Sequence, residues 1–363
     1  MNIFAINSKL PILAMAGLLQ CLTGVASAQV APFLPEGLPS SIAESKSAFY
    51  EEVGRASNGM TLVPFHILMP AIQRWTPGSV VRVAFSGGNV ALYKQIEDAA
   101  NIWITTGGAN VKLSFTDASG KYRIWRKTDT KYAAEIRVGF TPLTPEEAGY
   151  WSHVGTDSQI AAIRGGAPGQ HSMQLDGFHE QLPERWPAIV AHEFGHALGF
   201  QHEHQNPDGG CDFRFSDDPG YIKTKYDGKW FVADAAGRRP GLYTYMGGYP
   251  NAWKPDVVDR NLKALETSTA FLVGEFDKHS IMKYYFDESM FVSGRQSPCF
   301  TNYPNEILSA QDIVGVRQAY PSTSAGVTFA RSLKRNTLEV LKASPSASNK
   351  LKLQLQEQIQ RLK

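Results

Sequence analysis

Hydrophobic and polar positions alternate in three short segments of the first half of the chain, which is the pattern of half-buried β-strands. The alternation runs from Val81 to Phe85, from Val111 to Phe115 and from Ile136 to Phe140. Between the first two segments, residues 90–105 carry apolar side chains at helical spacing. The order strand, helix, strand, strand predicts an α/β (α+β) fold in which a sheet packs against helices.

A more buried helix is predicted over residues 187–199, because its apolar side chains face most directions around the helix axis. Pro187 suits the first helical position, and Gly199 suits the left-handed position that ends a helix. Residues 205–278, in contrast, are rich in glycine, proline, aspartate and aromatic residues and show little periodicity. We expect this region to be irregular and to be held by packing.

The C-terminal part of the chain predicts three more helices. Residues 309–320 form the first, with Ser309 as its cap and Asp312 in its first turn. Residues 321–326 then predict a linker. Beyond the linker, leucines at helical spacing indicate two short helices that are separated by residues 344–346.

The N-terminus has the pattern of a signal peptide. Lys9 precedes an apolar stretch from Leu10 to Val25, and the small residues Ala26-Ser27-Ala28 follow as a cleavage site. The stretch is short and no charged stop follows it, so we expect residues 1–28 to be removed and the protein to be secreted. Residues 29–70 are interpreted as a pro-segment or N-terminal extension, so a zymogen is expected.

Composition narrows the classes of partner. The formal net charge is only +2, so the chain as a whole gives no indication of nucleic-acid binding. Basic charge is concentrated in the tail, residues 322–363, where eight Lys or Arg oppose two Glu from residue 331 onward. Two interpretations stay open: a helix pair that packs on the rest of a monomer, which is favoured, or an anchor for anionic cell-surface polymers.

Two cysteines remain once residues 1–28 are removed. In an exported protein, Cys211 and Cys299 most simply form one disulfide. Two buried free thiols are the alternative that the sequence leaves open.

One run, HEFGHALGFQH, places three histidines and a glutamate in the spacing of a metal site. His192 and His196 are four residues apart on a helix, so both imidazoles project from one face. Gly199 permits a sharp turn, after which His202 can complete a zinc ligand set that leaves a position for water. Glu193 is then placed to act as the general base of a hydrolysis.

This run is the metzincin signature, which also requires a methionine turn downstream. Residues 280–284 supply that turn around Met282, a residue that would otherwise be interpreted as an ordinary core methionine. The third histidine is followed by Glu203, and Tyr284 stands two residues after the turn methionine. This pairing resembles the astacin family of metzincin zinc endopeptidases.

Three further segments are similar to astacins, namely residues 74–80, 149–155 and 308–313. The resemblance covers about residues 71–321, which it identifies as an astacin-like catalytic domain. Tyr150 departs from the family, because many members have a cysteine there. This departure concerns disulfides and substrate preference rather than the reaction.

The resemblance implies a two-lobed metzincin domain with a twisted mixed sheet, a central zinc-binding helix and a Met-turn. It implies hydrolysis of peptide bonds in polypeptide substrates by water held on one Zn²⁺ per chain. Glu203 would belong to a buried network near a processed N-terminus, and the strand from His171 to Leu175 would be the edge that pairs with substrate. The implied site residues are the ligands His192, His196, His202 and Tyr284, the catalytic residues Glu193 and Tyr284, and Met282 of the Met-turn.

Two other interpretations compete with this one. A matrixin-like or serralysin-like metzincin is disfavoured by Glu203 and Tyr284. A non-catalytic zinc-binding adhesion module on a metzincin scaffold is disfavoured by Glu193, because a structural zinc site needs no base beside an open position. The other histidines are interpreted as surface or core residues: His153, His171, His179, His204 and His279.

Overall fold

The computed structural model describes residues 37–57, 71–249, 251–265 and 275–362. The predicted signal peptide, the start of the predicted pro-segment and its last residues lie outside these ranges, so those predictions stay predictions. Among the described residues, no helix is both long enough and apolar enough to cross a membrane.

One sheet contains six strands in the order β2-β1-β4-β6-β5, with β3 paired to β1 beside this path. Every pairing is parallel except that of β5 with β6, which is antiparallel. The sheet is therefore mixed, as predicted. The strands are β1 (Val80–Ser86), β2 (Lys112–Ser114), β3 (Arg123–Ile124), β4 (Ile136–Gly139), β5 (Tyr150–Ser152) and β6 (Met173–Leu175).

The edge strand at one end of the sheet is β5, and the expectation for residues 171–175 is wrong. β6 lies between β4 and β5, with Val138 opposite Met173 on one side and Ser152 opposite Met173 on the other. The backbone of β6 is therefore engaged on both sides. A strand of three residues carries too little alternation for its place in a sheet to be predicted.

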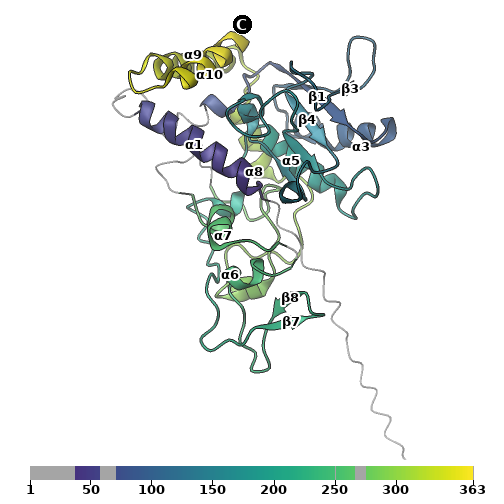
Figure 1. Cartoon of the computed structure of the whole chain (residues 1–363), viewed down its shortest axis with the longest axis vertical. Coiled ribbons are helices and arrows are strands. Elements are labelled where there is room, and N and C mark those ends of the chain that lie inside the picture. The colour runs from purple at the N-terminus through teal and green to yellow at the C-terminus, as the bar shows by residue number, and fades with distance from the viewer. Residues whose placement is uncertain (1–36, 58–70, 250, 266–274, 363) are drawn as a thin grey trace, which may run out of the picture. The chain divides into compact units, whose positions relative to one another are not determined.

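Helices from residues 90–197 pack on this sheet (Figure 1). The helix predicted over residues 90–105 is divided at Asn101 into α3 (Val90–Ala100) and α4 (Ile102–Thr105). The predicted central helix is α5 (Trp186–Ala197), which contacts α3, β5 and β6. Its buried side chains, such as Val190 and Phe194, join one large core with the sheet. The predicted cap is confirmed in α8 (Ala310–Ala319), where Ser309 and Asp312 form a reciprocal capping box.

Among the described residues, the region predicted as irregular contains short helices and strands, and its side chains take part in a second core. The elements are β7 (Thr224–Tyr226), β8 (Trp230–Val232), α6 (Leu242–Met246) and α7 (Pro255–Leu262). Aromatic side chains dominate this second core, including Phe213, Phe286 and Phe291. The predicted disulfide between Cys211 and Cys299 is present at its border, with Cα atoms 5.2 Å apart.

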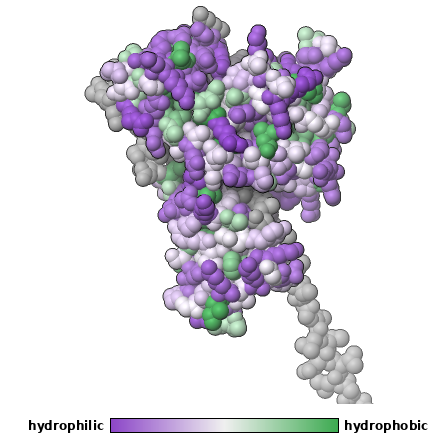
Figure 2. Space-filling model, viewed as in Figure 1, coloured by the Kyte–Doolittle hydropathy of each residue, from purple (hydrophilic) through white to green (hydrophobic). Residues whose placement is uncertain are grey.

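Three terminal helices share a third core. They are α1 (Ser40–Ser57), α9 (Ser324–Ala343) and α10 (Asn349–Arg361), which lie together in Figure 1. Leucines of α9 and α10 pack against α1 and against Ile72, Ile160 and Ile163. The outer surface in this part of Figure 2 is mostly hydrophilic. The tail thus forms the packed helix pair of the favoured interpretation, while its binding to anionic polymers stays a prediction.

The stability of this third core is expected to increase with pH because of Lys334. This α9 residue is 5% exposed, and its ammonium donates to the carbonyl oxygens of Ile72 and Arg74. Burial lowers the pKa of Lys334 to about 7. The unfolded pKa is about 10.4, so between about pH 7 and 10 the unfolded chain binds a proton that the folded chain does not.

Folding is therefore favoured as the pH rises through that window. Between pH 6.5 and 9, the free energy of unfolding of the wild type should rise by about 2 kcal/mol more than that of Lys334→Met. Denaturant titrations at both pH values measure this difference. Parallel pH profiles in the two proteins would contradict it.

Candidate metal centre

Helix α5 and the turn after it bring the three predicted histidines together. His192 and His196 project from one face of the helix, which ends at Ala197. Gly199 then adopts the left-handed conformation (φ +97°), as predicted, and the chain turns back to His202. One nitrogen from each imidazole lies within 4.8 Å of the others. A side chain with a Cβ would be strained at Gly199, so the turn depends on that glycine.

The remaining nitrogen of two of these rings is held by the backbone. His192 Nδ1 lies 2.6 Å from the carbonyl oxygen of Ile281, and His196 Nδ1 lies 2.7 Å from that of Phe200. A carbonyl only accepts hydrogen bonds, so each Nδ1 carries the proton and each Nε2 keeps its lone pair. The Nε2 atoms of His196 and His202 are 2.9 Å apart. Imidazole nitrogens that converge in this way are a suitable donor set for a zinc ion.

The methionine turn holds residues of the site through its backbone carbonyl groups. Its residue Ile281 orients His192, and the carbonyl oxygen of Met282 accepts a hydrogen bond from the backbone nitrogen of Glu203 at 2.9 Å. The turn itself is fixed by Asp312 of α8, whose carboxylate accepts from Ser280 Oγ at 2.6 Å and from the backbone nitrogen of Ile281 at 2.9 Å. The sequence indicated Asp312 only as a residue of the first turn of this helix.

Met282 approaches α5 closely because of a glycine. A Cβ on Gly195 would lie 2.3 Å from the Met282 sulfur and 2.8 Å from the Trp103 ring, so a larger residue would displace both. The indole nitrogen of Trp103 also donates to the carbonyl of Ala191 at 2.7 Å. Met282 and Trp103 therefore pack closely against the part of α5 that carries His192 and His196.

Glu193 and Tyr284 both neighbour the three histidines. Glu193 follows His192 on α5 and is fully buried. Burial raises the pKa of Tyr150 on β5, and the negative charges of Asp176 and Glu193 raise it further. The Tyr284 ring centre is 4.3 Å from that of His202 and 5.8 Å from that of His192.

His204 is a core histidine, one of the two interpretations that the sequence left for it, and it packs beside Tyr284. It is buried, and its Nε2 lies 2.8 Å from the carbonyl oxygen of Asn261 at the end of α7. Burial lowers the pKa of His204 well below its ordinary value, so the ring is neutral. Its centre is 4.5 Å from that of the Tyr284 ring. His204 thus links the phenol to α7, a long-range contact that no local pattern indicates.

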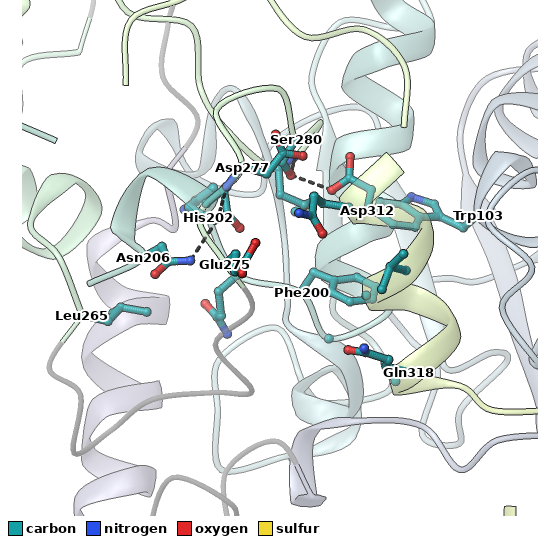
Figure 3. Close-up of a pocket in the computed structure, with 18 of the residues that line it drawn as sticks. Trp103, Phe200, His202, Asn206, Leu265, Glu275, Asp277, Ser280, Asp312 and Gln318 are labelled. Atoms are coloured by element: carbon teal, nitrogen blue, oxygen red, sulfur yellow. Dashed lines mark hydrogen bonds between the residues drawn. The ribbon is translucent and has the colours of Figure 1, made fainter. Parts of the chain in front are cut away.

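Described residues line two cavities beside the three histidines His192, His196 and His202, which are called the triad below. The larger one, about 400 Å³, is lined by Glu203, Asp277 and Asp312, of which Asp277 and Asp312 are labelled in Figure 3. Glu203 Oε1 accepts hydrogen bonds from Asn206 Nδ2 and the backbone nitrogen of Asp277, both at 3.0 Å, and burial raises the pKa of Glu203 to about 7. The predicted processed N-terminus beside this network stays a prediction.

The smaller cavity, about 240 Å³, lies on the β5 side of the triad. It is bounded by the two ligand candidates His196 and His202, by β5, by the end of α7 and by α1. This arrangement places a hollow beside the sheet edge and the convergent imidazoles.

Comparisons with protein-family models and with curated proteins found no match. Among solved structures, the chain is similar to two structures of myroilysin. One is 27% identical, covers 69% of this chain and 97% of that chain, and has a TM-score of 0.47. The other is 25% identical, covers 69% of this chain and 86% of that chain, and has a TM-score of 0.40. With both TM-scores below 0.5, the function has to be argued from the site itself.

Proposed function

We propose that this chain is a secreted zinc-dependent endopeptidase of the metzincin type, with an astacin-like site. One observation carries the proposal: nitrogens of three imidazoles converge within 4.8 Å, with a buried glutamate beside the first of them on the same helix. A structural zinc site has no use for a carboxylate in that position. The combination supports hydrolysis rather than metal storage.

The residues divide the work as follows. A zinc ion held by His192, His196 and His202, with Tyr284 as a further ligand, would supply Lewis acidity toward water and toward the scissile carbonyl. Glu193 accepts the proton that water loses as it attacks, and then delivers a proton to the nitrogen of the departing amine. The Tyr284 hydroxyl donates a hydrogen bond to the oxygen that gains negative charge.

The substrate is a polypeptide in extended conformation. β5 is the antiparallel edge strand beside the triad, so its backbone offers hydrogen bonds to an added strand. Recognition through the backbone tolerates many side chains and suits cleavage inside a chain. The side chains that border the 240 Å³ cavity would then select among sequences.

Metal analysis together with a protease assay tests this function. The purified protein should contain one zinc per chain, hydrolyse azocasein, lose activity with a chelator and recover it when zinc is returned. His196→Ala should lose both zinc and activity, because two imidazoles hold the ion poorly. A wild-type protein that is loaded with zinc yet cleaves neither azocasein nor unfolded polypeptides would instead be a non-catalytic zinc-binding module.

A further inference from the structure

Helix α1 buries its apolar face, and it falls in the segment interpreted as a pro-segment or N-terminal extension. Phe49, Val53 and Ala56 are at most 5% exposed and belong to the core that α9 and α10 form. Glu52 Oε1 also accepts a hydrogen bond from the backbone nitrogen of Ser348, in front of α10. Loss of α1 would expose one side of this core to water.

A buried carboxylate ties α1 to the rest of the protein. Asp157 is fully buried, and its carboxylate accepts hydrogen bonds from the Tyr50 hydroxyl and from Gln73 Nε2, the latter at 3.0 Å. Lys46 Nζ lies 3.1 Å from the same carboxylate. Tyr50 and Lys46 both belong to α1, so its departure would remove the cation and the phenol from a buried charge. Such a change is strongly unfavourable.

Helix α1 also borders the cavity beside the three histidines. Lys46, Ser47 and Tyr50 line it together with His196, His202 and β5. Just before α1, Gly37 lies against the far side of the same cavity. A Cβ there would be 2.9 Å from the Trp253 ring and 3.1 Å from Asn261 Oδ1. In Figure 1 the first turn of α1 points toward the middle of the molecule, away from its packed C-terminal end.

We propose that α1 is a permanent part of the protein and forms one wall of the cleft in which the substrate binds. Cleavage of the chain between α1 and Ala71 would leave α1 bound through its core contacts and Asp157. The retention of α1 follows from the contacts alone. Its role in selecting peptides rests, in addition, on the proposed peptidase function.

Retention is tested by cutting the chain after α1. A recognition site for a specific protease is placed within residues 58–70, and the full protein is cleaved and passed through a gel-filtration column under native conditions. Mass spectrometry should find the fragment containing α1 in the same peak as the remainder, and separated from it only in denaturant. A fragment that elutes alone, beside a remainder with unchanged circular dichroism and melting, would overturn the proposal.

Two single variants sharpen this test. In the cut protein, Val53→Asp places a charge in the shared core and should release the fragment. Ala48→Asp introduces the same side chain at an exposed position of the same helix, so the fragment should stay bound. Equal retention in both variants would contradict a core-held α1.

The position of α1 in the wall of the substrate cleft is tested with tryptophan substitutions at two adjacent residues. Ser47 is exposed and lines the cavity, so Ser47→Trp should fill part of it without harming the fold. We expect KM for peptide substrates to rise about tenfold with kcat nearly unchanged, and the cleavage-site profile to shift. Ala48→Trp, which lies outside the cavity lining, is the control and should leave both constants unchanged.

The possible results separate the two proposals. If Ser47→Trp matches the wild type in KM and in cleavage profile, α1 forms no wall of the substrate cleft. If the wild-type protein hydrolyses no peptide at all, the peptidase function fails, while the gel-filtration result still decides whether α1 is retained.

Discussion

Replacing Glu193 by glutamine is expected to lower kcat by about 10³–10⁴-fold while the zinc content stays at one per chain. The amide has nearly the shape of the carboxylate, so the packing of this fully buried position is kept. Glutamine cannot accept a proton from the attacking water, whereas the three imidazoles and their carbonyl partners are unchanged. Binding of the ion is thereby separated from the chemistry.

The measurement combines kcat on a quenched peptide with metal analysis of the same preparation. Glu184→Gln is the matched control, because Glu184 is exposed just before α5 and should be silent. A Glu193→Gln protein with kcat within tenfold of the wild type would remove the general base from the mechanism. Loss of zinc in that variant would make Glu193 a structural residue of the metal site.

The arrangement of the three histidines was largely predictable, because it depends on the spacing of residues within one short segment of the sequence. The spacing of His192 and His196, the turn at Gly199 and the return to His202 are fixed by helix geometry within one short run. The same holds for the capping box of α8. Long-range contacts of the site could not be predicted. Nothing in the local sequence around Asp312, for example, indicates that its carboxylate also binds the methionine turn.

The order of the strands could not be predicted for a related reason. β5 and β6 have three residues each, so their alternation is too short to fix their neighbours or direction. His204 gives another example, because its hydrogen bond to Asn261 spans 57 positions of the sequence. Such contacts depend on the assembled fold.

Helix α1 is different, because its signal was present in the sequence. Ile42, Phe49, Val53 and Ala56 are spaced seven, four and three residues apart, which places them on one face of a helix. Many polar residues lie between these apolar positions, and prolines flank the segment, so it was interpreted as a pro-segment or N-terminal extension. The partners of this face, in α9 and α10, follow it by almost three hundred residues, so only the fold shows what it buries against.

Replacing Tyr284 by phenylalanine is expected to lower kcat by about 10²–10³-fold, with little change in KM, folding or zinc content. The ring packs between His202 and His204, at 4.3 and 4.5 Å between centres, and only 3% of the residue is exposed. Phenylalanine keeps this packing and removes only the oxygen. The variant therefore isolates the hydrogen bond that the phenol would give to the charged oxygen of the transition state.

Tyr285→Phe is the control, since Tyr285 is the next residue and is only half-buried. It should be nearly silent, because the ring contacts with His192 and His202 come from Tyr284, and none is found for Tyr285 among the described residues. Kinetics, thermal unfolding and metal analysis are measured on both variants. Wild-type kcat in Tyr284→Phe would make this tyrosine a packing residue. Hydrolysis would then depend on His192, His196, His202 and Glu193 alone, and the feature that most separates an astacin-like site from other metzincins would have no catalytic role.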